Sequence, residues 1–145
     1  MSFSLAAQGA SSRLARAVVS ALGAAVIAAG CGASPDERAA ADLTNGKALF
    51  VAGTEGNPSC GSCHVLGDAG TQGTIGPSLD DAFSASRANG FAESTVFEVV
   101  RRQIEIPRAG SAMPADLVTG KDAVDVAAYV ARVAGTKGLE AQDAP

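Results

Sequence analysis

The chain has 145 residues, three cysteines and a formal charge of −4, and only 4% of its residues are aromatic, with no tryptophan. This length predicts a single domain once any targeting segment is removed. Because the chain has few large side chains, its core has room for a bulky buried cofactor. The negative charge argues against a nucleic-acid partner, because phosphate binding requires clustered lysine and arginine.

The first thirty residues have the order of a bacterial export signal. Arg13 and Arg16 precede an apolar run over residues 17–29, which is shorter than the roughly 20 residues of a membrane-spanning helix. The following Gly30-Cys31 step, with Ala28 and Ala29 before it, resembles the lipobox of bacterial lipoproteins. That resemblance implies cleavage before Cys31 and lipidation of its thiol. An uncleaved anchor, or a plain signal beside an unrelated cysteine, are the alternatives, and both also export the domain.

The remaining chain divides into three predicted parts. Residues 31–41 are mostly small and polar and predict a tether, residues 42–135 form the folded domain, and residues 136–145 are a flexible tail. A chain cut before Cys31 would have a formal charge of −6. We therefore expect a protein of the bacterial cell envelope, lipid-anchored to the outer face of a membrane.

Three helices are predicted in chain order, and no strand pattern is found. The first spans residues 38–51, where Leu43 and Phe50 lie one heptad apart, and it ends in a loop at residues 53–58. Residues 67–79 predict a long loop. A second helix over residues 94–104 carries an apolar stripe and ends before Pro107. That stripe comprises Val96, Val99, Val100 and Ile104.

The third helix begins near Thr119, lines one face with Val126 and Val130, and stops at Gly135. The spacing of Thr95 with Glu98, and of Thr119 with Asp122, predicts a capping box at the start of each of the last two helices.

The segment Cys60-Gly61-Ser62-Cys63-His64 is the attachment motif of c-type haem. Two thiols separated by two residues on one turn can reach the two vinyl groups of a haem. The next residue then lies beneath the porphyrin, where a neutral imidazole can bind iron. We therefore predict one covalent haem c, with Cys60 and Cys63 as the attachment residues and His64 as an iron ligand.

Three other uses of the same residues fit less well. A thioredoxin-like site requires a strand before the first cysteine, whereas a glycine-rich loop precedes Cys60. A zinc site requires four ligands, and two cysteines with the only histidine leave one position empty. A disulfide between Cys60 and Cys63 would be strained and would give His64 no role.

Met113 is the predicted second axial ligand of the iron. His64 is the only histidine, and the only other methionine is Met1, which would leave with the signal. Met113 lies in a loop between Gly110 and Pro114, and histidine with methionine is a known pair of haem ligands. Core packing is the usual role of a lone methionine, and a lysine, a water or an open position remain alternatives on the iron.

With these motifs, residues 42–134 resemble class I monohaem cytochromes c. The resemblance implies an all-α fold with three to four main helices packed around one covalently bound haem. Gly46 and Phe50 resemble the pattern of the family's N-terminal helix, and Tyr129 that of its C-terminal helix, which cross near right angles.

The segment Gly76-Pro77-Ser78-Leu79 resembles the part of the family that follows the haem motif. It implies a hydrogen bond from His64 Nδ1 to the Pro77 carbonyl, and packing of Leu79 on the haem face. The tryptophan that many relatives place near a haem carboxylate is missing. Four arginines are the candidates to replace it: Arg87, Arg101, Arg102 and Arg108.

The predicted function is one-electron transfer rather than catalysis, because an iron bound by both His64 and Met113 has no open position for a substrate. Redox proteins such as an oxidase or a dehydrogenase would be the partners, together with the membrane through the lipid anchor, and no nucleic acid. The alternatives are a haem subunit fixed in a larger membrane oxidoreductase and a gas-binding or sensing haem domain.

Overall fold

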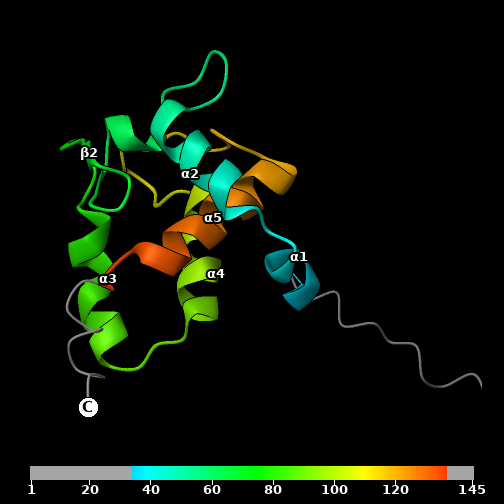
Figure 1. Cartoon of the computed structure of the whole chain (residues 1–145). Coiled ribbons are helices and arrows are strands. Elements are labelled where there is room, and N and C mark those ends of the chain that lie inside the picture. The colour runs from blue at the N-terminus through cyan, green and yellow to red at the C-terminus, as the bar shows by residue number, and fades with distance from the viewer. Residues whose placement is uncertain (1–33, 137–145) are drawn as a thin grey trace, which may run out of the picture. The chain divides into compact units, whose positions relative to one another are not determined.

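The computed structural model describes residues 34–136, and these residues are mainly helical (Figure 1). Four helices have ten or more residues: α2 (Leu43–Ala52), α3 (Leu79–Ala88), α4 (Glu93–Glu105) and α5 (Gly120–Val133). A short helix α1 (Pro35–Ala39) precedes them, and a 3₁₀ turn η1 (Cys60–Ser62) follows α2. The all-α prediction with three to four main helices is therefore confirmed.

The predicted first helix is divided in two. Asp42 caps α2, since its side chain accepts hydrogen bonds from the backbone N–H groups of Thr44 and Asn45 at 2.9 and 3.0 Å. The short α1 begins at Ser34, which forms a capping box with Glu37, and it contacts α5. The part of the predicted tether that the structure describes is therefore partly helical, which its small, polar composition did not indicate. Cys31 lies outside the described residues.

Helices α2 and α5 pack together through the residues expected from the resemblance. Gly46 is buried, and a Cβ at that position would overlap the Asp125 carbonyl of α5. The rings of Phe50 and Tyr129 meet edge to face with centroids 6.0 Å apart. Glycine at position 46 therefore permits the close approach of the two helices.

Helix α3 was not predicted: it begins where the predicted loop over residues 67–79 ends, and it occupies residues for which no element was predicted. Ser78 caps it by accepting from the Asp81 N–H at 3.2 Å, and Asp80 and Asp81 lie in its first turn. None of its residues is fully buried, and Leu79, Ala82 and Phe83, which share one face of the helix, line a pocket. The Arg87 guanidinium holds it to the end of α5 by donating to the carbonyls of Ala131 and Ala134.

Two further details differ from the prediction. Helix α4 is capped by Ala92 and α5 by Thr119, neither with a side-chain hydrogen bond, so both predicted capping boxes are wrong. The carboxylate of Asp122 instead accepts from Asn45 Nδ2 at 3.2 Å. A two-residue antiparallel pair, β1 (Val65–Leu66) with β2 (Thr71–Gln72), closes the loop after His64.

The core lies between α4 and α5. Val96, Phe97 and Ile104 of α4 are buried against Val126 and Val130 of α5. Val99 was predicted on the same stripe, but 45% of its surface is exposed and it lines a pocket instead. Within residues 34–136, no helix has both the length and the apolar character to span a membrane.

Candidate haem site

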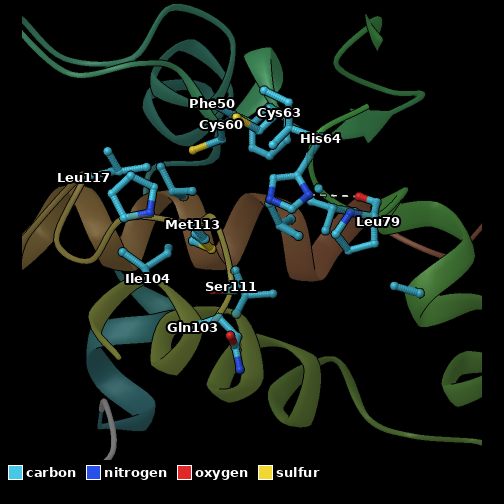
Figure 2. A pocket seen from close by; sticks show the side chains of 18 of the residues that line it. Phe50, Cys60, Cys63, His64, Leu79, Gln103, Ile104, Ser111, Met113 and Leu117 are labelled. Atoms are coloured by element: carbon cyan, nitrogen blue, oxygen red, sulfur yellow. Dashed lines mark hydrogen bonds between the residues drawn. The ribbon is translucent and has the colours of Figure 1, made fainter. Parts of the chain in front are cut away.

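The Cys60–His64 motif forms a single tight turn. Ser59 caps it by accepting from the Ser62 N–H at 3.2 Å, and the Cys60 carbonyl accepts from Cys63 and His64 at 3.1 and 3.0 Å. This turn brings the side chains of Cys60, Cys63 and His64 to the wall of one pocket (Figure 2).

The His64 ring is held in one orientation by the segment after the hairpin. Its Nδ1 lies 2.8 Å from the Pro77 carbonyl oxygen, the contact that the resemblance implied (Figure 2). Because a carbonyl only accepts, Nδ1 carries the proton and Nε2 keeps its lone pair. The hydrogen bond therefore fixes the orientation of the ring and leaves Nε2 as the nitrogen available to bind a metal.

Gly76 leaves the space that the His64 ring occupies beside Pro77. A Cβ at position 76 would overlap Cε1 and Nδ1 of His64, and the Gly76 N–H donates to the Cys63 carbonyl at 2.8 Å. The motif turn and the Gly76-Pro77 step are thus in direct contact, with the His64 ring held against Gly76.

Gly76→Ala is expected to displace the His64 ring and to lower the yield of haem-bearing protein several-fold. Thr74→Ala, in the same loop but with an exposed side chain, is the matched control and should keep the normal yield. Haem absorbance per protein, measured after denaturation so that only covalent haem is counted, provides the comparison. An unchanged yield for Gly76→Ala would show that the ring does not need this space.

The rest of the pocket is mostly apolar and encloses about 550 Å³, within the 300–1,000 Å³ range of ligand and cofactor sites. Met113 reaches into it from the loop between α4 and α5, and Leu79 lines it at the start of α3 (Figure 2). The other apolar walls include Phe50, Phe83, Val100, Ile104, Val126 and Val130. Phe83 comes from the unpredicted helix α3, which is why the sequence did not indicate it.

These residues fit a covalent haem. One pocket collects two thiols, an imidazole with a free nitrogen, a thioether and a set of apolar walls. Cys60 and Cys63 form no disulfide, so both thiols remain available. Burial raises the pKa of the Cys60 thiol above its usual value, with the neighbouring Cys63 a smaller contribution, so Cys60 is a neutral thiol at neutral pH.

The charge around the pocket is sparse. Arg108 is the one arginine or lysine among the residues that line the pocket, and Gln103 also lines it. Arg87 is engaged with α5, and Arg101 contacts Glu98 and Glu105 of its own helix. Of the four arginines considered for the haem carboxylates, the structure thus brings Arg108 alone to the pocket wall.

A multi-residue metal site is not found in the described part of the chain. Residues 34–136 contain no group of three or more His, Cys, Asp or Glu side chains placed to hold an ion. The zinc alternative therefore gains no support from the structure.

Comparisons with known proteins agree with the geometry. Residues 43–134 match the family model described as cytochrome c. The crystal structure of the c-type cytochrome SorU from Sinorhizobium meliloti is similar, with 29% sequence identity and a TM-score of 0.50. The similarity covers 70% of this chain and 95% of that one. A search among curated proteins finds no match.

Proposed function

Because the chain belongs to the cytochrome c family, whose cofactor is a covalent c-type haem with iron, we propose that it is a His/Met-ligated one-electron carrier. Cys60 and Cys63 would attach the haem, and His64 and Met113 would bind its iron. The haem supplies the redox chemistry, in which iron changes between its ferric and ferrous states. The observation that carries the proposal is the presence of all four side chains in one apolar pocket.

The protein's own residues would keep the site ready for electron transfer. Pro77 fixes the tautomer and the orientation of His64, so the imidazole need not rearrange when the iron changes charge. The apolar walls exclude water and, together with a thioether ligand, favour the less charged ferrous state. Arg108 and Gln103 line the pocket and would be the polar side chains available to the haem carboxylates.

A redox titration with a ligand-binding assay tests this function. We expect a positive midpoint potential and no binding of carbon monoxide by the reduced protein at neutral pH, because His64 and Met113 would leave the iron no free position. A strongly negative potential would contradict the carrier role. Rapid carbon monoxide binding would instead favour the gas-binding alternative.

The same proposal includes export and anchoring. Members of the cytochrome c family are typically exported to the periplasm. We propose that Cys31 is lipidated and holds this domain at a membrane surface, where it exchanges electrons with a partner such as an oxidase or a dehydrogenase.

Cys31→Ser should therefore move the haem protein from the membrane fraction to the soluble fraction of cells that export it. Cys31→Ser leaves Cys60 and Cys63 intact, so the haem colour follows the protein in both fractions. Equal membrane association of the variant and the unaltered chain would contradict lipidation.

A further inference from the structure

The segment around Met113 has no hydrogen bonds of its own within the described residues. None of the hydrogen bonds among residues 34–136 involves residues 112–115. On one side of this segment, Ser111 N–H donates to the Arg108 carbonyl at 3.0 Å. On the other side, Asp116 N–H donates to the Ile104 carbonyl, also at 3.0 Å. The position of Met113 is therefore set by the anchors that flank it.

One flanking anchor connects this loop to the other side of the pocket. The Leu117 carbonyl oxygen accepts from Thr54 Oγ1 and from Asn57 Nδ2, each at 3.3 Å. Asn57 Nδ2 is also 3.2 Å from Thr54 Oγ1, so the three groups form a closed set. We call Thr54, Asn57 and the Leu117 carbonyl the loop clamp. The Leu117 side chain lines the same pocket as Met113 (Figure 2).

The Thr54 and Asn57 side of the clamp is itself held in place. Asn57 N–H donates to the Thr54 carbonyl at 3.0 Å, which closes a turn. Gly53, at a φ of 75°, lies beneath this turn, since a Cβ there would be 2.9 Å from the Asn57 carbonyl and 3.0 Å from the Ser59 nitrogen. The turn leads directly into Ser59 and Cys60. The clamp thus joins the segment that attaches the haem to the segment that carries Met113.

We propose that Thr54 and Asn57 are positioning residues that hold the Met113 loop closed, and so keep the thioether on the iron. This inference rests on the proposed function, because it takes Met113 as a ligand. A methionine sulfur is a weak ligand, so an added ligand can replace it whenever the loop opens. The apparent affinity for such a ligand rises in proportion to the open population. Loss of a clamp hydrogen bond enlarges that population without touching the iron.

Imidazole binding to the oxidised, haem-loaded protein tests the clamp. Thr54→Val removes the hydroxyl at nearly constant volume, and Asn57→Ala removes the amide at an exposed position. Each removes two of the three contacts of the clamp and should raise the apparent imidazole affinity roughly five- to tenfold, within the range expected for the net loss of one to two hydrogen bonds. Thr54→Ser keeps the hydroxyl and should remain within about twofold of the unaltered protein. Thr95→Val, on the exposed surface of α4, is the matched control and should cause no change.

The outcomes separate this inference from the proposed function. If the unaltered oxidised protein lacks the weak absorption band at the red edge that reports sulfur–iron bonding, the coordination and the clamp are both wrong. If it has the band but Thr54→Val and Asn57→Ala bind imidazole as the unaltered protein does, only the clamp is wrong. Equal gains for Thr54→Ser and Thr54→Val would also overturn it, since the hydroxyl would then be irrelevant. Should Thr54→Val fail to fold, Asn57→Ala alone decides.

Discussion

Replacing Met113 with alanine should lower the midpoint potential and open the iron to carbon monoxide and cyanide. Loss of the thioether removes the ligand that favours the ferrous state. We expect the potential to fall by on the order of 0.1 V, a small part of the roughly 0.8 V over which axial ligands tune haem proteins. Redox titration and ligand binding measured on the same preparation provide the test.

Met113→Leu is the control for packing. Leucine has nearly the same volume as methionine and should preserve the pocket, but it has no sulfur to bind iron. Both variants should therefore lose the red-edge band and bind carbon monoxide when reduced, while Met113→Leu keeps more of the thermal stability. Retention of the band and the potential in either variant would show that another group binds the iron.

Replacing Asp125 with alanine should destabilise the domain by about 3 kcal/mol, because hydrogen bonds to a charged group contribute about 1.5–3 kcal/mol each. The Asp125 carboxylate is fully buried. It accepts from Asp42 N–H at 2.8 Å, from Asn45 Nδ2 at 2.9 Å and from Lys121 Nζ at 2.7 Å. The first two donors belong to the start of α2, so the carboxylate holds that end of α2 against α5.

Asp122→Ala is the matched control for Asp125→Ala. It removes the same side chain three residues earlier on α5, where Asp122 is half-buried and accepts one hydrogen bond, from Asn45. We expect its cost to stay below about 1 kcal/mol. Urea unfolding of the haem-loaded variants gives both values. A similar loss of unfolding free energy in the two variants would show that the buried contacts of Asp125 add no stability beyond those of Asp122.

The same carboxylate predicts how stability depends on pH. Burial raises the pKa of Asp125, but hydrogen bonds from Lys121, Asn45 and the Asp42 backbone outweigh it, and the net result is a lowered pKa. A lowered folded-state pKa means that the unfolded chain binds the proton first, so the stabilisation is complete above about pH 4 and is lost on further acidification. Asp125→Asn should therefore reduce this acid sensitivity. Asp68, whose pKa is lowered by the Tyr129 hydroxyl and by Lys47, supplies part of what remains.

The sequence predicted the parts of this protein that have strong local signals. The Cys60–His64 spacing is specific because attachment of a haem requires two thiols and an imidazole at these separations. Val96, Val100 and Ile104 show the helical period of α4. The close approach at Gly46 and the contact between His64 and Pro77 came from the family resemblance, and the structure contains both.

Other features depend on contacts between distant residues and had no local signal. Helix α3 is short and buries no residue completely, and its position depends on Arg87 reaching α5. The loop clamp joins Thr54 to Leu117 across 63 positions of the chain, and Asp125 reaches Asp42 across 83. Polar residues of these types usually lie at the surface, so their presence in the sequence does not indicate such contacts.

The covalent attachment of the haem is tested most directly by peptide mass analysis. Residues 48–87 contain no lysine or arginine before Arg87, so trypsin should release one peptide, cut after Lys47 and Arg87, that includes Cys60, Cys63 and His64. We predict that this peptide stays coloured after denaturation and carries the added mass of one haem. A colourless peptide of unmodified mass, from cells that mature other c-type cytochromes, would contradict the account.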